Sequence, residues 1–288
     1  MNLRKQLLPP GWYPQSAEKV REFLETLEQS SLEQSSLELH SLELHSKAVI
    51  APHAGWHYSG RIAKRAFKAL KPGADTVVVI GGHLPAGVPP LFAEEDGVVT
   101  PLGVLEIDRE FRDLIWKEIG GKPDLYYDNT VEVLLPMVKF YFPKARLIWL
   151  RLGAEIQSYE AGRIIASIAC SLKRRPVLIG STDLTHYGLN YNFAPRGTGL
   201  QALEWVKNEN DAAFIQAVLS GRAGAVLDRA AADKSSCSPG AVLACMGYAH
   251  ALKASKAALL SYAAGAASQE ADIPDSFVGY AAMAFFPA

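Results

Sequence analysis

Two histidines follow two apolar, strand-like runs of this sequence. His53 comes just after the run at 47–51, and His83 comes after two glycines at the end of the run at 76–80. In an open α/β sheet, ligands bind beyond the carboxyl ends of the strands, and neighbouring strand ends converge there. Imidazole is the commonest metal-binding side chain and exchanges protons near neutral pH. The pair therefore predicts a shared metal or acid–base site, although either histidine alone is more typical of a structural residue.

Cys237 precedes a predicted helix that has Pro239 near its first position. A thiol at a helix N-terminus has a lowered pKa, so its thiolate is accessible. Two histidines and one cysteine would leave open positions on a metal ion, and this ligand set suits iron, copper or zinc. Two alternatives stay open. In the first alternative to metal binding, Cys237 is a small buried hydrophobic residue. In the second, it is a nucleophile with His186 as its base.

Asp183 and His186 follow the apolar run at 176–179 and are separated by two residues. On one helical turn, side chains at this spacing face the same point. A carboxylate and an imidazole there suit general acid–base catalysis or the orientation of a metal-bound group, so both are candidate catalytic residues. The alternative is that Asp183 caps a short helix.

Four further residues are candidates for a pocket. His57 and Tyr58 share a loop with His53, and Asn129 and Glu132 lie together in a later segment. Glu132 is the one acid in a mainly apolar helical pattern, and a buried acid needs a partner. It is a ligand, a base or a structural acceptor for a neighbouring donor.

Composition excludes several classes of partner. The chain has 288 residues, of which 49% are hydrophobic, and a formal net charge of −1. Without a basic excess, nucleic acids and anionic membranes are not expected partners. No apolar run reaches the ~18 residues of a membrane span, and the N-terminus lacks an apolar region of signal-peptide length. Three cysteines without regular spacing favour a reducing compartment, so we expect a cytoplasmic protein.

Apolar runs and amphipathic patterns alternate along the chain. Strand-like runs lie at 47–51, 76–80, 147–150, 176–179, 258–262 and 277–286. Helical patterns lie at 16–28, 59–70, 108–119, 131–141, 156–173, 198–219 and 239–253, and 98–107 is typical of a hairpin. Near-continuous apolar strands indicate a sheet covered on both faces. The alternation favours one three-layer α/β/α domain over residues 1–288, with a mixed, mostly parallel central sheet.

One stretch falls outside this pattern. Residues 29–46 repeat Ser-Leu-Glu with a period of five, which fits neither a strand nor one helical face. We predict a surface insertion there and assign it no function.

Several of these segments, taken together and in order, resemble the Memo family, which includes microbial proteins called AmmeMemoRadiSam system protein B. The segments are 51–60, Gly82-His83, 132–136, 181–188 and Cys237. The resemblance runs from Gly11 to Ala281. It implies a fold similar to that of class III extradiol dioxygenases. It also implies iron or copper held by His53, His83 and Cys237, with Asp183 and His186 nearby. It supplies no substrate.

Asn129 departs from the family pattern, which usually has a histidine at this position. Asparagine can hydrogen-bond but cannot shuttle a proton at neutral pH. Two functions therefore stay open. The first is a metal-dependent, dioxygenase-like oxidoreductase using iron or copper, with zinc as a further option. The second is a non-enzymatic protein that binds a small molecule or peptide and retains the fold. A homo-oligomer is compatible with both.

Overall fold

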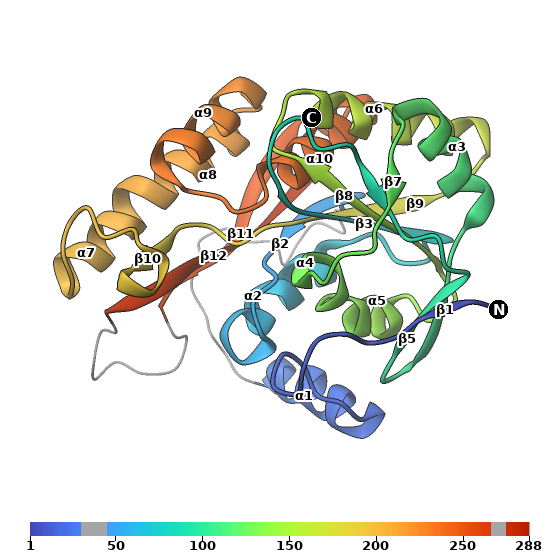
Figure 1. The fold of residues 1–288 in the computed structure, drawn as a ribbon, viewed down its shortest axis with the longest axis horizontal. Helices are drawn as coiled ribbons and strands as arrows, with labels where there is room; N and C mark the ends of the chain where they lie inside the picture. The colour runs from blue at the N-terminus through green and yellow to red at the C-terminus, as the bar shows by residue number, and fades with distance from the viewer. Residues whose placement is uncertain (30–44, 266–274, 288) are drawn as a thin grey trace.

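A mixed β-sheet forms the centre of the molecule (Figure 1). The computed structural model describes residues 1–29, 45–265 and 275–287. Within this part of the chain the sheet has the order β10-β12-β2-β9-β3-β8-β4-β7, and β11 also pairs with β12. Its strands are β2 (Ala48–Ala51), β3 (Thr76–Leu84), β4 (Leu91–Phe92), β7 (Lys122–Pro123), β8 (Arg146–Gly153), β9 (Pro176–Ser181), β10 (His186–Gly188), β11 (Lys256–Ala264) and β12 (Ser276–Phe286).

The parallel pairs lie in the centre of this sheet. β2 pairs in parallel with β9, β9 with β3, and β3 with β8. Antiparallel pairs flank this block: β12 runs against β2 on one side, and β4 runs against β8 on the other. The predicted mixed sheet is confirmed, and its parallel block brings the carboxyl ends of four strands to one edge.

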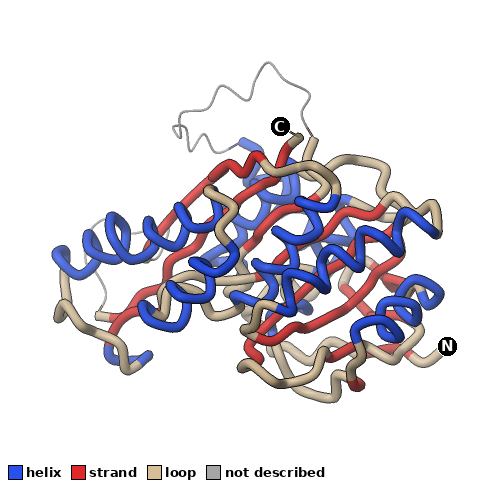
Figure 2. Tube along the Cα trace, turned by 90° about the horizontal axis from the view of Figure 1, so that it is seen from above, coloured by secondary structure: helices blue, strands red, loops and turns tan. Residues whose placement is uncertain are grey.

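Side chains alternate between the two faces of the sheet, as the pleat requires. Val77 and Val79 pack into one core with residues of the helices at 56–69 and 135–141. Val78 and Ile80 pack into a second core with residues of the helices at 109–119, 157–171 and 239–251. Helices therefore cover both faces, as Figure 2 shows. This arrangement confirms the α/β/α layers and explains why the central strands are almost continuously apolar.

The helices follow the predicted positions with three differences. They are α1 (Ala17–Gln29), α2 (Trp56–Ala69), α3 (Arg109–Ile119), α4 (Asn129–Glu132), α5 (Leu135–Tyr141), α6 (Gln157–Ser171), α7 (Leu200–Trp205), α8 (Asp211–Leu219), α9 (Ala223–Asp233) and α10 (Pro239–Ala251). The predicted helix at 131–141 is two helices, and Pro136 lies in the first turn of the second, where its missing N–H is tolerated. The predicted helix at 198–219 is interrupted by a π-helical turn at Val206–Asn210, and α9 was not predicted.

The hairpin predicted at 98–107 is confirmed by β5 (Gly97–Thr100) and β6 (Gly103–Glu106), which are antiparallel. The N-terminal strand β1 (Leu3–Arg4) joins them through a parallel pairing with β5. Most of the repeat at 29–46 lies outside the described residues. No helix in the described ranges is long and apolar enough to cross a membrane.

Candidate metal centre

His53, His83 and Cys237 converge at the carboxyl edge of the parallel strands. Their candidate ligand atoms all lie within 4.8 Å of one another, and Cys237 Sγ is 3.2 Å from His53 Nε2. His53 follows β2, His83 lies near the end of β3, and Cys237 precedes α10. Nitrogen and sulfur ligands of one tetrahedral metal ion are about 3.3–3.6 Å apart. The three side chains therefore meet at a spacing that suits a shared metal ion.

His53 is held in place from two sides. Its backbone N–H donates to Asp183 Oδ1 at 2.7 Å, and its ring Nδ1 is 2.9 Å from the hydroxyl of Ser181. The side chain is only 1% exposed. A histidine ligand usually has its second nitrogen hydrogen-bonded in this way, because the bond fixes the ring orientation. Nε2 is left to face the sulfur.

His83 has a different local geometry. Its φ of 57° lies in the left-handed region, at an irregularity in the pairing of β3 with β8. Such a backbone conformation is uncommon for a residue with a side chain. The ring Nδ1 is 3.0 Å from Asp128 Oδ2, so Nε2 is the nitrogen available to a metal ion. His83 is also the most exposed of the three candidate ligands.

Cys237 is tied to Asp183 through the main chain. Its N–H donates to the Asp183 carbonyl at 3.2 Å, and its sulfur accepts from the Asp183 N–H at 3.3 Å. Asp183 therefore links two candidate ligands, because its carboxylate also accepts from the backbone of His53.

Charges around the sulfur favour the thiolate. Burial by itself would raise the pKa of Cys237, but His53 and His83 outweigh it and hold that pKa well below its ordinary value. Burial would lower the pKa of His83, but Asp128 and Cys237 raise it to about 10. A thiolate among cationic imidazoles is the arrangement from which a metal ion displaces protons.

Asp183 and His186 do not share a helical turn, so that prediction is wrong. The segment between β9 and β10 is extended: the Leu184 N–H donates to the Gly279 carbonyl at 2.8 Å, and His186 pairs with Val278 in the sheet. Pairing with β12 competes with helix formation, and it also excludes the predicted helix cap at Asp183. The two side chains still influence each other. Burial raises the pKa of Asp183, and the charges of His53 and His186 oppose that shift.

His186 and the two predicted pocket residues of α2 each contact an aromatic ring. The ring of His186 meets Tyr191 edge to face at 5.0 Å between centroids, and its Nδ1 is 3.1 Å from the Leu184 carbonyl. His57 and Tyr58, in the first turn of α2, are exposed and contact each other edge to face at 5.2 Å.

Asn129 and Glu132 have contacts of different kinds. The Asn129 amide donates to the His53 carbonyl at 2.9 Å, so this residue borders the centre. Glu132 is buried and accepts hydrogen bonds from the N–H groups of Leu7 and Leu8 and from the hydroxyl of Tyr13. Of the three roles open to Glu132, these contacts correspond to the structural acceptor.

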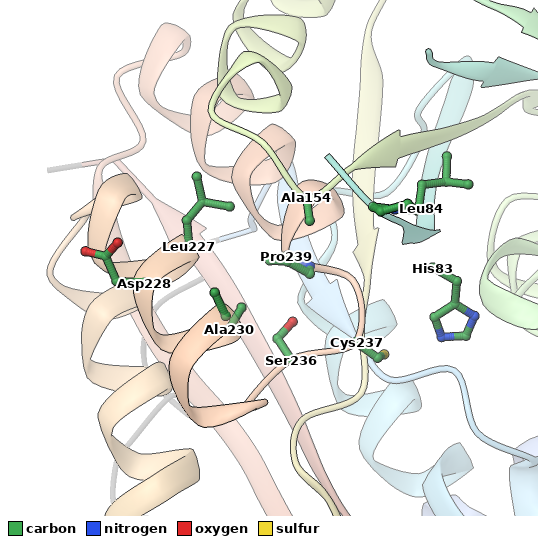
Figure 3. Close-up of a pocket in the computed structure, with 11 residues that line it drawn as sticks. His83, Leu84, Ala154, Leu227, Asp228, Ala230, Ser236, Cys237 and Pro239 are labelled. Carbon is green, nitrogen blue, oxygen red and sulfur yellow. The ribbon is translucent and has the colours of Figure 1, made fainter. Parts of the chain in front are cut away.

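A cavity of about 430 Å³ opens beside the centre. Figure 3 shows His83 and Cys237 at one end and Leu227, Asp228 and Ala230 of α9 at the other. The described residues that line it are His83, Leu84, Pro85, Ala154, Leu227, Asp228, Ala230, Ala231, Ser236, Cys237 and Pro239. The four predicted pocket residues His57, Tyr58, Asn129 and Glu132 are not part of this lining.

Three residues that hold the centre in place were not predicted as site residues. Ser181 contacts His53, Asp128 contacts His83, and Arg151 contacts Asp128. Ser181 lies in the segment 181–188 noted above, and Asp128 directly precedes the predicted pocket residue Asn129. The signal for Arg151 is weaker: it is the one charged residue inside an otherwise apolar strand run.

Known proteins similar to this chain give a consistent picture. A family model described as Memo-like protein matches residues 4–284. A MEMO1 family protein from Pyrococcus horikoshii is 32% identical, with 82% of this chain and 85% of that protein covered. Another from Pyrococcus abyssi is 33% identical with the same coverage, and one from Pyrococcus furiosus is 28% identical with 98% of both chains covered.

A solved structure supports the fold independently. The crystal structure of an uncharacterised protein from Escherichia coli K12 matches with a TM-score of 0.50 and 11% sequence identity, and the match covers 82% of this chain and 99% of that one. At this identity the likeness concerns the fold alone. The family match spans nearly the whole chain, which therefore belongs to the Memo-like family.

Proposed function

We propose that this protein is a metal-dependent oxidoreductase in which His53, His83 and Cys237 hold iron or copper. The observation that carries the proposal is the convergence of their ligand atoms within 4.8 Å. Each ring also has its other nitrogen near a fixed oxygen, from Ser181 or Asp128. Imidazole and thiolate ligands suit copper, iron and zinc better than they suit magnesium or calcium.

Bound iron or copper would supply redox chemistry with dioxygen. The protein's own groups would position the substrate and move protons. Asp183, 3% exposed, fixes the backbone of His53 and Cys237. His186 has its Nδ1 3.1 Å from the Leu184 carbonyl. Because that nitrogen donates to the carbonyl, Nε2 is the ring nitrogen that would exchange a proton. The cavity lined mainly by small and apolar side chains favours a small organic substrate over a large polar one.

The first experiment is anaerobic reconstitution with Fe(II) or Cu(I), followed by measurement of affinity and oxygen uptake. Cys237→Ser should weaken binding at least about tenfold, because a thiolate ligand is replaced by a hydroxyl that is rarely ionised. Cys170→Ser, at an exposed thiol, is the matched control and should bind as the wild type does. Absence of oxygen uptake with either metal, across catechols and simple reductants, would contradict the oxidoreductase.

The second candidate is a non-enzymatic protein that binds a small molecule or peptide. The observation that favours it is Asn129. Its side-chain amide donates a hydrogen bond to the His53 carbonyl, and it cannot shuttle protons at neutral pH. Elemental analysis of the purified protein separates the two candidates. If the purified protein contains no metal and its melting temperature does not change when Fe(II), Cu(I) or Zn(II) is added, the non-enzymatic binding protein is supported.

A nucleophilic Cys237 with His186 as base has less support, because the histidine beside the sulfur is His53. Iodoacetamide labelling tests it: protection of the thiol by metal favours ligation over nucleophilic catalysis.

A further inference from the structure

Arg151 is a buried arginine on β8, only 3% exposed, with a separate acceptor for each part of its guanidinium. Nε donates to the Gly82 carbonyl at 3.0 Å. Nη1 is 3.2 Å from Asp124 Oδ1, and Nη2 is 3.1 Å from Asp128 Oδ2. A planar guanidinium can satisfy several acceptors in a fixed geometry, which a lysine cannot do.

Two of these acceptors are parts of the structure that carries His83. Asp128 Oδ2, which Arg151 contacts, is the same oxygen that lies 3.0 Å from His83 Nδ1. Gly82 is the residue immediately before His83, whose φ is 57°. Arg151 therefore reaches the backbone on one side of His83 and, through one carboxylate, the ring on the other.

The rest of the network keeps both carboxylate partners of Arg151 in place. Asp128 Oδ1 accepts from the Thr130 N–H at 2.8 Å, so the carboxylate is held at both oxygens. Asp124 Oδ2 accepts from the Trp149 indole N–H at 2.9 Å. A buried charge is costly unless it is paired and hydrogen-bonded. Arg151 is the one charged side chain in the buried part of β8. Two of its donors contact groups that hold His83, namely the Gly82 carbonyl and the Asp128 carboxylate.

We propose that Arg151 is a positioning residue for the metal centre, acting through Asp128 and the Gly82 carbonyl to fix the ring of His83. This inference rests on the metal site proposed above. It predicts that loss of Arg151 weakens metal binding without removing any ligand atom.

The experiment measures Co(II) affinity and the sulfur-to-cobalt charge-transfer absorption of the full-length protein. Arg151→Gln should weaken Co(II) binding about 10- to 100-fold, the range seen when residues that orient metal ligands are replaced. At saturating Co(II) the sulfur band should persist, because Cys237 is intact. Arg151→Lys should recover part of the lost affinity, since lysine keeps the positive charge but lacks the planar guanidinium that contacts several acceptors at once.

A double-mutant cycle that combines Arg151→Gln with Asp128→Asn tests whether Arg151 acts on His83 through Asp128. Because part of the effect of Arg151 passes through Asp128 and part through the Gly82 carbonyl, the double variant should lose less Co(II) affinity than the two single losses added together.

Arg174→Gln is the control for loss of a partly buried ion pair, because Arg174 pairs at 3.2 Å with the buried Asp108. Asp108 contacts Thr76 at the start of β3, whereas His83 lies near the end of that strand. Arg174→Gln should leave Co(II) affinity unchanged.

Wild-type affinity in Arg151→Gln, an equal loss in Arg174→Gln, or fully additive losses in the double variant would each overturn the inference. If Arg151→Gln does not fold, Arg151→Lys and Asp128→Asn decide: wild-type affinity in both overturns the inference. In each of these cases the proposed metal site stands, provided that Cys237→Ser loses Co(II). If the wild type does not bind Co(II), or Cys237→Ser binds equally well, the metal site fails and this inference fails with it.

Discussion

Each candidate ligand is fixed by a residue from another segment of the chain. Ser181 contacts the ring of His53, Asp128 contacts that of His83, and the backbone of Asp183 brackets Cys237. Side chains that are already ordered lose less conformational entropy when they bind a metal ion. The same contacts determine which ring nitrogen is free. At the scale of single residues, the centre is preorganised by polar contacts that a list of ligands would not reveal.

Asp211 is a further buried carboxylate, and it contacts the segment between β9 and β10. It accepts from the Thr185 N–H and the Tyr262 hydroxyl, and it thereby anchors the segment that carries Asp183 and His186. Burial raises the pKa of Asp211 to about 6, although the hydrogen bonds from Thr185 and Tyr262 oppose that shift. The native state therefore holds this proton more tightly than the unfolded chain does.

The pH dependence of stability follows from this pKa. The contribution of Asp211 to folding is fully present below its ordinary pKa of 3.8 and is lost as pH rises through about 6. Asp211→Asn cannot titrate. The unfolding free energy of the wild type, minus that of the variant, should therefore be about 2 kcal/mol larger at about pH 4.5 than at about pH 7.5. Urea unfolding of both proteins at both pH values measures this difference in unfolding free energy. A difference that is the same at the two pH values would contradict the raised pKa of Asp211.

At the scale of elements, the centre depends on a close approach between the end of β3 and the start of α10. A Cβ on Gly82 would lie 2.9 Å from the Cα of Ser238 and would overlap its side chain. Ser238 follows Cys237 directly. The absence of a side chain at Gly82 therefore lets the cysteine approach His83.

Gly82→Ala should destabilise the protein by about 1–3 kcal/mol, the usual cost of overpacking. Gly224→Ala is the matched control, because Gly224 lies in α9 and a Cβ there meets no atom within 4 Å. An alanine in that helix should be neutral or stabilising by up to about 1 kcal/mol. Denaturant unfolding compares the two variants, and equal stabilities would show that β3 can move away from α10 without cost.

At the scale of the whole molecule, the N-terminal residues clamp the segment that supports both histidines. Arg4 donates to the Asp124 carbonyl and stacks over Trp149. Three residues later the chain begins to bind Glu132. The segment from Asp124 to Glu132, which contains Asp128 and Asn129, is therefore held at both ends by the first residues of the chain.

Glu132→Gln tests whether this glutamate is structural. Loss of the carboxylate weakens acceptance from the N–H groups of Leu7 and Leu8, and leaving buried donors poorly paired costs about 1–3 kcal/mol. We expect lower stability and faster limited proteolysis near the N-terminus, with a smaller loss of Co(II) affinity than in Asp128→Asn. A variant with full stability and weakened metal or ligand binding would instead support the predicted pocket role.

The sequence by itself determined the order of the longer strands and most of the helices, because apolar runs and helical spacing are local patterns. It also supplied the three candidate ligands. His53 follows β2 and His83 lies near the end of β3, and these strands belong to one parallel block and end at the same edge of the sheet, although β9 lies between them. Cys237 precedes the helix predicted at 239–253. Prediction from the sequence failed where local preference was overridden: pairing with β12 keeps the segment around His186 extended, and a π-helical turn interrupts the helix predicted at 198–219.

Only the tertiary structure decided which side chains support the centre. Glu132 meets Leu7 across 125 positions of sequence, and His83 meets Asp128 across 45. Arg151 reaches Gly82 across 69 positions. Contacts over such separations depend on how strands and loops pack together, and the type of a residue carries no record of its distant partner. The sequence therefore names the groups that would bind a metal ion, whereas the fold determines which residues hold them in position.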